Sequence, residues 1–261
     1  MNLESLTKQL IQIESISPND AGCFDILESI LEGMNFSCER ISYKNVENLY
    51  AVIGSQGPTL CFLGHTDVVP TGPSDQWTYP PFSGETHDDH IYGRGAADMK
   101  GNICAFVEAL GSFLKTEKLN YRIAILLTSN EEGTPEDGFI DELLKELKSR
   151  GETIDYCLVG EPSSSLKVAD TIRIGRRGSL SGNLKIIGKQ GHIAYPEKII
   201  NPIFLVTDLI KILKEKKWDS GNEHFQPTSF QISNINSGTG AGNIVPGELI
   251  MDFNFRFCSE S

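Results

Sequence analysis

The sequence has few positive charges and no long apolar segment. Lys and Arg number 23 against 35 Asp and Glu, which gives a net charge of −12. Nucleic acids and anionic membrane surfaces are bound through positive patches, so this balance disfavours both as partners. No run approaches the ~18 apolar residues that a membrane-spanning helix requires. The N-terminal stretch also lacks the basic start and the apolar core of a signal peptide.

Cysteines are sparse, and their spacing suggests no pairing. The chain contains no Cys-x-x-Cys motif, and its six cysteines are scattered: Cys23, Cys38, Cys61, Cys104, Cys157 and Cys258. Isolated cysteines of this kind are typical of proteins whose thiols stay reduced. We therefore expect free cysteines and a cytoplasmic protein.

The rest of the composition is that of an ordinary globular protein, with 39% hydrophobic and 22% charged residues over 261 positions. This length allows one large domain or two smaller ones. Apolar runs at Thr59–Leu63, Ile123–Ser129 and Tyr156–Gly160 predict buried strands. They alternate with segments of helical spacing such as Cys23–Met34. This alternation indicates an α/β domain with a mostly parallel central sheet.

Each of the three predicted strands is followed by residues of the types that bind metals in proteins. His65 and Asp67 follow the first strand, Glu131 and Glu132 the second, and Glu161 the third. In an extended chain, residues two apart point the same way, so His65 and Asp67 share one face. The carboxyl ends of parallel strands meet at one edge of a sheet, where binding sites gather. We therefore expect these five side chains to lie close together.

A glycine-rich turn supplies a further carboxylate. Asp98 lies within Ile91–Asn102, directly before a predicted helix at Ile103–Lys115. The glycine spacing matches neither a P-loop nor a dinucleotide-binding motif, and a carboxylate is unsuited to phosphate. So many acids together would raise one another's pKa values unless divalent metals bind between them. Taken singly, any of these acids could instead be a helix cap or a solvated loop residue.

The pattern of the sequence changes after Arg177. Strand candidates at Leu180–Ile187, Ser229–Ile235 and Leu249–Phe257 surround a predicted helix at Pro202–Lys217. The order strand, helix, strand, strand predicts a smaller α+β domain. We therefore expect a catalytic, metal-binding domain at residues 1–177 and a second domain at residues 178–261.

Four blocks of sequence resemble one group of enzymes. They are Gly64-His-Thr-Asp-Val-Val-Pro-Thr-Gly, Tyr92-Gly-Arg-Gly-Ala-Ala-Asp-Met-Lys-Gly, Leu127-Thr-Ser-Asn-Glu-Glu-Gly and Val159-Gly-Glu-Pro-Ser. The group is the dizinc aminoacylase/carboxypeptidase family of metallohydrolases. Four further blocks narrow the resemblance to its bacterial succinyl-diaminopimelate desuccinylases: Ser15-Ile-Ser-Pro-Asn-Asp, Gly175-Arg-Arg-Gly-Ser, Gly191-His-Ile-Ala-Tyr-Pro and Gly242-Asn-Ile-Val-Pro. The resemblance implies a zinc-peptidase-like catalytic domain and a ferredoxin-like lid and dimerisation domain.

The resemblance also implies a set of metal ligands. His65, Asp98 and Glu161 would hold one Zn²⁺, and Asp98 would bridge to a second that Glu132 also holds. The complete family enzymes hold two zinc ions in each subunit, and Co²⁺ can substitute. A cis peptide bond commonly follows the bridging aspartate, which here would join Asp98 to Met99.

The catalytic and substrate-binding roles follow from the same resemblance. Glu131 would be the general base and acid, and Asp67 would orient the imidazole of His65. His192, in the small domain, would reach the partner subunit's active site and stabilise the tetrahedral oxyanion. Three residues are candidates for holding the carboxylates of the substrate: Arg176, Tyr195 and Asn243. Arg94 and Lys100 are expected to be structural salt-bridge partners.

The implied activity is the removal of succinate from N-succinyl-LL-2,6-diaminopimelate, a step of lysine and diaminopimelate biosynthesis, by a homodimer. Two alternatives stay open. One is an N-acetylornithine deacetylase or another aminoacylase with the same metals, and the other is an inactive metal-binding or dimerisation remnant. The chain ends at Ser261, whereas the resembled family continues, completes both domains and adds a histidine for the second zinc. We therefore expect either a fragment of a longer protein or a truncated product with a compromised second metal site.

Overall fold

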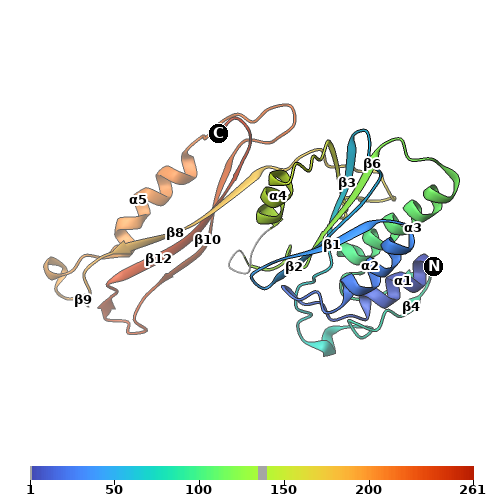
Figure 1. The fold of residues 1–261 in the computed structure, drawn as a ribbon. Coiled ribbons are helices and arrows are strands. Elements are labelled where there is room, and N and C mark those ends of the chain that lie inside the picture. The colour runs from blue at the N-terminus through green and yellow to red at the C-terminus, as the bar shows by residue number, and fades with distance from the viewer. Residues whose placement is uncertain (1, 135–139) are drawn as a thin grey trace. The chain divides into compact units, whose positions relative to one another are not determined.

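The computed structural model describes residues 2–134 and 140–261. The chain divides into two compact units, Met1–Val168 and Ala169–Ser261, and Figure 1 shows the elements of each. The predicted domain boundary between residues 177 and 178 stays a prediction. It coincides with the start of strand β8 (Gly178–Ile187), after an irregular segment.

A five-stranded mixed sheet forms the centre of the first unit. Its strands, in spatial order, are β1 (Ser37–Tyr43), β2 (Val46–Ile53), β6 (Arg122–Thr128), β3 (Thr59–His65) and β7 (Tyr156–Val159). β3 pairs in parallel with β6 and β7, whereas the pairs β1–β2 and β2–β6 are antiparallel. The predicted α/β class is confirmed. The parallel arrangement holds for the three strands that lead to the predicted site, and β1 and β2 add an antiparallel part.

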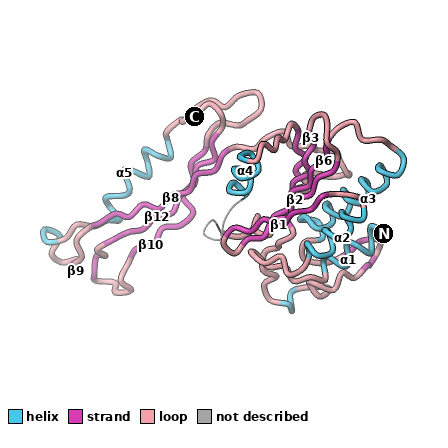
Figure 2. Tube along the Cα trace, in the orientation of Figure 1, coloured by secondary structure: helices cyan, strands magenta, loops and turns pink. Residues whose placement is uncertain are grey.

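Helices cover both faces of this sheet. α1 (Leu3–Ile11), α2 (Cys23–Gly33) and α3 (Gly101–Thr116) lie on one face, and α4 (Ile140–Ser149) lies on the other (Figure 2). Successive residues of β6 point to opposite faces. Ile125 belongs to the same core cluster as Phe24 and Ile103, whereas Leu126 packs with Leu143 of α4. This double coverage is the reason that the strand is apolar throughout.

Short elements join β3 to α3. They are the 3₁₀ turn η1 (Ser74–Gln76), β4 (Thr86–His87), β5 (His90–Ile91) and the π-helical turn η2 (Ala96–Lys100). Across the part of the chain that the structure describes, every helix is too short or too polar to cross a membrane.

Three antiparallel strands and one helix form most of the second unit. The strands, in spatial order, are β10 (Ser229–Ser237), β12 (Glu248–Phe257) and β8, and the helix is α5 (Pro202–Glu215). Asn201 caps α5 by accepting a hydrogen bond from the amide of Ile203. Val206 of α5 packs with Leu249 and Met251 of β12. A small ribbon of β9 (Gly191–His192) and β11 (Ile244–Val245) and the 3₁₀ turn η4 (Pro196–Lys198) complete the unit, which has the predicted α+β arrangement.

Candidate metal centre

The end of β3 is held directly against the turn that carries Asp98. His65, the last residue of β3, is almost completely buried. A Cβ atom at Gly64 would lie 2.7 Å from Met99 Cε, so only a glycine lets Met99 pack this closely on the strand. The amide nitrogen of His65 also lies 3.4 Å from Met99 Sδ. The chain therefore places Asp98 beside His65 by packing its neighbour against β3.

The two nitrogens of the His65 ring have different partners. Nδ1 lies 2.9 Å from the backbone oxygen of Asp67 and 3.5 Å from Asp67 Oδ1. A carbonyl oxygen only accepts hydrogen bonds, so Nδ1 carries a proton. Nε2 lies 3.1 Å from Asp98 Oδ1 and 3.4 Å from Glu161 Oε1. Nε2 is therefore the nitrogen that the fold offers to a cation.

Asp98 projects from an irregular turn at the start of α3. The backbone of Gly95 is left-handed, with φ of 80°, and Asp98 has the non-helical angles φ −126° and ψ 99°. The peptide bond between Asp98 and Met99 is cis, as the resemblance implied. The Asp98 side chain remains about half exposed, so its carboxylate is open to a ligand as well as to His65.

The other acids come from the chain directly after β6 and β7. The amides of Glu131 and Glu132 donate to Oδ1 and Oδ2 of Asp67, each over 3.1 Å. Glu161 follows β7 by two residues, and Asn102 of α3 fixes this segment by donating to the Gly160 carbonyl over 2.6 Å. The structure thus brings together all six residues that the sequence predicted at this edge of the sheet.

Two overlapping groups of potential ligands share His65. One contains Asp98 and Glu132, and the other contains Glu131 and Glu161; within each group the ligand atoms lie within 4.8 Å of one another. The charges in these groups are unbalanced. Burial raises the pKa of both Glu132 and Glu161, and the neighbouring carboxylates of Asp98 and Glu131 raise it further.

The imidazole responds to the same excess of negative charge. Burial by itself would lower the pKa of His65, but the hydrogen bonds and charge of Asp67 and the charge of Glu161 outweigh it and raise the pKa to about 9. The site therefore favours a positive charge at Nε2. An imidazole nitrogen surrounded by carboxylate oxygens is a donor set that suits a divalent metal ion. The residues present fit metal binding.

The predicted substrate-binding residues lie in the second unit. Pairing of β9 with β11 places Asn243 Nδ2 3.4 Å from His192 Nε2, and the rings of His192 and Tyr195 are 6.0 Å apart. The amide of Ala194 donates to His192 Nδ1 over 3.1 Å, which makes Nδ1 an acceptor and fixes the orientation of the ring. Arg176 lies in the irregular segment before β8.

Sequence reasoning assigned no role in the site to the polar residues behind it. Ser17 donates to Asp67 Oδ2. Asp20 is buried and accepts from Thr66 Oγ1 over 2.9 Å and from the Phe24 amide over 2.9 Å. Lys100 is fully buried, and the expected salt bridge is replaced by two hydrogen bonds of 2.8 Å to the carbonyls of Leu10 and Ile13. Asp20 stands just before a helix, which is a capping signal that could have identified it.

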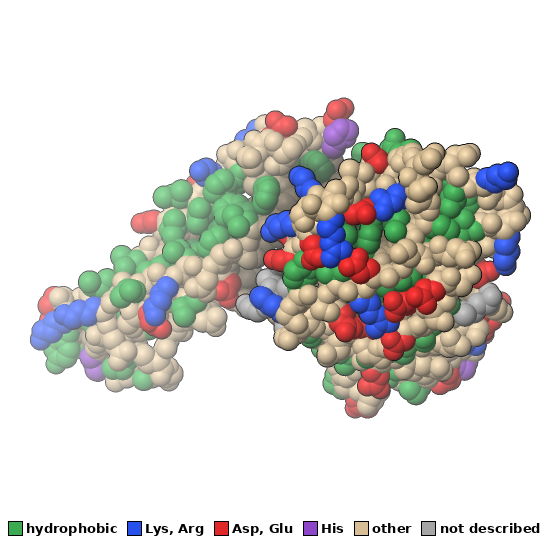
Figure 3. Space-filling model, in the orientation of Figure 1, with side chains coloured by type: hydrophobic (Ala, Val, Ile, Leu, Met, Phe, Trp, Pro, Cys, Tyr) green, Lys and Arg blue, Asp and Glu red, His purple; other side chains and the backbone are tan. Residues whose placement is uncertain are grey.

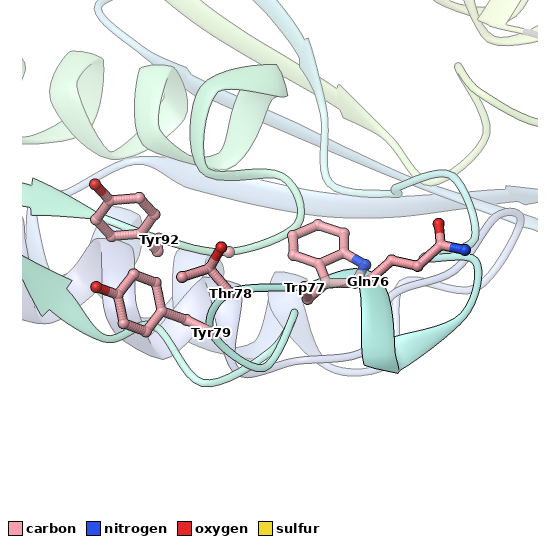
Figure 4. Close-up of a pocket in the computed structure, with 6 residues that line it drawn as sticks. Gln76, Trp77, Thr78, Tyr79 and Tyr92 are labelled. Carbon is pink, nitrogen blue, oxygen red and sulfur yellow. The ribbon is translucent and has the colours of Figure 1, made fainter.

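The loop between β3 and the Asp98 turn holds an aromatic surface cavity of about 470 Å³ (Figure 4). Its lining residues are Gln76, Trp77, Thr78, Tyr79, Tyr92 and Gly93. Tyr79 also stacks on His87, with ring centroids 3.8 Å apart. None of the predicted site residues lines this cavity, so it is separate from the metal centre.

The sequence matches the peptidase family M20/M25/M40 over residues 61–245. Two curated relatives are named succinyl-diaminopimelate desuccinylase. The protein from Alkalilimnicola ehrlichii is 50% identical over 256 residues, and that from Methylobacillus flagellatus is 52% identical over 257 residues. Each alignment covers 98% of this chain and 68% of the relative.

Solved structures of the same family share the fold. An M20 family metallo-carboxypeptidase from Sulfolobus solfataricus superposes with a TM-score of 0.71 at 18% identity, covering 100% of this chain and 72% of that one. A dinuclear metal binding peptidase of the M20 family from Bacillus subtilis gives 0.63 at 14% identity, covering 99% and 64%. The family match, the half-identical relatives and the strand-end ligand groups together show that this chain belongs to the peptidase family M20/M25/M40 and carries the site of a metal-dependent hydrolase.

Proposed function

We propose that this chain is a zinc-dependent amide hydrolase that removes succinate from N-succinyl-LL-2,6-diaminopimelate, in lysine and diaminopimelate biosynthesis. One observation carries the proposal: the strand-end ligand cluster belongs to a chain that is 50% identical, over 98% of its length, to a protein named succinyl-diaminopimelate desuccinylase. From this biosynthetic role we also propose a cytoplasmic location. We further propose that residues 1–177 form the catalytic domain and residues 178–261 the lid and dimerisation domain.

His65, Asp98 and Glu161 would hold one Zn²⁺, and Asp98 and Glu132 would hold a second, with Co²⁺ able to substitute. The proximity of Asp98 and Glu161 to His65 Nε2, at 3.1 and 3.4 Å, supports the first set. When bound, the metal ions supply Lewis-acid chemistry, which makes a water molecule more acidic and polarises the amide carbonyl.

Glu131 acts as the proton carrier. Its carboxylate takes a proton from the attacking water as the new C–O bond forms, and then delivers that proton to the amide nitrogen as the C–N bond breaks. The products are succinate and LL-diaminopimelate. The hydrogen bond from the Glu131 amide to Asp67 supports this role, because it fixes the residue beside the ligand cluster.

The second unit supplies recognition of the substrate. His192 acts from the partner subunit of a homodimer and donates its Nε2 proton to the oxyanion, while Arg176, Tyr195 and Asn243 bind the substrate carboxylates. The hydrogen bond from the Ala194 amide to His192 Nδ1 supports this role, because it fixes the orientation of the imidazole ring. Hydrophobic side chains around α5 support dimerisation through this unit (Figure 3), since Phe204 is 73% and Ile212 61% exposed.

The test is hydrolysis of N-succinyl-LL-2,6-diaminopimelate and of N-acetylornithine by the purified chain, loaded with Zn²⁺. We expect release of succinate that a chelator abolishes and added Zn²⁺ restores. Glu131→Gln should reduce turnover by about 10²–10⁴-fold while zinc remains bound, whereas the exposed Glu14→Gln should be unaffected. Faster cleavage of acetylornithine would assign the chain to that deacetylase class. Zinc binding without hydrolysis of either substrate would support a non-catalytic remnant.

A further inference from the structure

We infer that Ser17 is a positioning residue of the hydrolytic site, because its hydroxyl fixes the carboxylate that joins the metal-binding histidine to the proton-carrying glutamate. The inference rests on the proposed function. Ser17 lies in the loop between α1 and α2, far along the chain from both of these residues, and it touches neither. It acts through Asp67.

The Asp67 carboxylate is a junction between three segments of the chain. It is fully buried. Oδ1 accepts from the Glu131 amide over 3.1 Å and lies 3.5 Å from Nδ1 of His65. Oδ2 accepts from the Glu132 amide over 3.1 Å and from the hydroxyl of Ser17. The rotation of this one carboxylate therefore sets the backbone that carries Glu131, and it adds to the 2.9 Å contact by which the Asp67 backbone oxygen holds the ring of His65.

The backbone of Ser17 is held by hydrogen bonds of its own, and its hydroxyl adds only a long contact of 3.4 Å to the Val68 carbonyl. Its amide donates to the Val68 carbonyl over 3.2 Å, and the Val68 amide donates to the Ser15 carbonyl over 2.9 Å. From the other side, Ser129 Oγ donates to the Pro18 carbonyl over 2.7 Å. Removing the hydroxyl of Ser17 therefore leaves these backbone hydrogen bonds in place, and the main partner that it frees is the Asp67 carboxylate.

The same segment provides a matched control. The hydroxyl of Ser15, two residues earlier, is fully buried and donates to the backbone carbonyl of Thr66 over 2.6 Å. Ser15→Ala deletes a hydrogen bond of the same loop without touching the Asp67 carboxylate. Ser15→Ala therefore reports the general effect of removing a hydroxyl from this loop, and the additional effect of Ser17→Ala reports on Asp67.

The first measurement needs no catalysis. In the metal-free chain, amide hydrogen exchange of Glu131 and Glu132, followed by NMR, should be at least about tenfold faster in Ser17→Ala than in Ser15→Ala. Ser17→Thr keeps the hydroxyl and should restore slow exchange. Equal exchange rates in the two alanine variants would overturn the inference.

The second measurement separates turnover from substrate binding. With N-succinyl-LL-2,6-diaminopimelate and Zn²⁺, Ser17→Ala should lower kcat by about 10–100-fold, because misplaced groups behind a metal site have effects of this size. KM should change by less than about threefold. Ser15→Ala should keep the wild-type kcat. Equal losses of kcat in both variants would show that Ser17 only stabilises the loop and would overturn the inference. If the wild-type chain hydrolyses nothing, the proposed function fails, while the exchange measurement still decides the role of Ser17.

Discussion

His65 is the residue at which a proton and a metal ion compete. The surrounding carboxylates raise its pKa to about 9, so in the metal-free chain Nε2 remains protonated at neutral pH. Metal binding must displace that proton and any proton held by Glu132 or Glu161, whose pKa values are also raised. The affinity for metal therefore depends on the same charges that create the site.

This competition predicts that Zn²⁺ affinity rises with pH. Between pH 6 and the His65 pKa of about 9, each displaced proton should contribute up to about tenfold in affinity per pH unit. Calorimetric titrations in buffers of different ionisation enthalpy measure both the affinity and the number of protons released. The exposed His90→Ala should behave as the wild type. An affinity that is constant over this range would show that Nε2 is already unprotonated.

The single residues of the site differ in how far sequence could identify them. His65, Asp98, Glu131 and Glu161 stood out because each follows an apolar strand or a glycine-rich turn, which is a local pattern. Ser17 did not, because its function depends on a contact with a residue 50 positions away. Asp67 was predicted to orient His65, but the sequence could not show which of its atoms does so. In the structure, the backbone oxygen of Asp67 lies nearer to His65 Nδ1 than its carboxylate does.

At the scale of elements, the turn η2 depends on close backbone packing. A Cβ atom at Gly101 would lie 2.3 Å from the backbone oxygen of Ala96. A backbone atom cannot move aside as a flexible side chain does, so a larger residue here would deform the turn that presents Asp98.

We therefore expect Gly101→Ala to destabilise the protein by roughly 1–3 kcal/mol and to weaken Zn²⁺ binding. Gly33→Ala is the matched control, because a Cβ at Gly33, the last residue of α2, meets nothing within 4 Å. It should be neutral or stabilise by up to about 1 kcal/mol. Denaturant unfolding measures both free energies. Equal stabilities for the two variants would show that η2 tolerates a side chain at Gly101.

A partly exposed ion pair links β6 and β2 to the chain after α4. Glu152 accepts hydrogen bonds from Arg122, the first residue of β6, and from the hydroxyl of Tyr50 in β2 over 2.9 Å. The hydrogen bond from Arg122 lowers the pKa of Glu152 below its ordinary value of 4.5, against a smaller effect of burial. A carboxyl group with a lowered pKa stabilises the fold above its unfolded pKa, and this stability is lost as the pH falls through the folded value.

Glu152→Gln should therefore lower the free energy of unfolding by about 1–2 kcal/mol at pH 7. The difference from the wild type should begin to shrink below pH 4.5 and disappear as the lowered pKa is passed. Urea unfolding at several pH values measures this. Glu39→Gln, which removes an exposed ion pair with Arg150, should cost less than about 0.5 kcal/mol at any pH. A loss from Glu152→Gln that is independent of pH would contradict the ionic account.

The sheet shows what patterns along the chain predict at this scale. Runs that are apolar on both faces correctly predicted buried strands at β3 and β6. The third run does form a strand, β7, but the prediction that it is buried is wrong, because all four of its residues are exposed at the edge of the sheet. The polar ends of the three strands predicted the site. The same patterns carry no information on the direction of a neighbour. β1 and β2 pair antiparallel because only Lys44 and Asn45 separate them, which forces the chain to turn back.

At the scale of the whole molecule, the metal ligands and the predicted substrate-binding residues fall in different units. The segment between these units is irregular and carries exposed apolar residues, with Val168 96% and Ile174 88% exposed. It also contains four sites for trypsin: Lys167, Arg173, Arg176 and Arg177.

Brief trypsin treatment should therefore cut first within residues 167–177 and leave two fragments that resist further digestion. Mass spectrometry of the early fragments identifies the cut. Each fragment should retain protected amides in its own sheet, β3 and β6 in one and β8 and β12 in the other. Early cleavage within Thr59–Thr128 would show that the first unit does not fold as a compact body.

The strand order of the first unit also dictates when its central strand can form. β3 lies between β6 and β7, both of which follow it in the chain, whereas β1 can pair with β2 as soon as both are synthesised. On the ribosome, the apolar segment Thr59–His65 therefore stays without a partner strand until residue 128 has emerged. Such a segment is a natural target for chaperones that bind nascent chains. We therefore expect the order of the strands to make folding of this unit during synthesis dependent on chaperones.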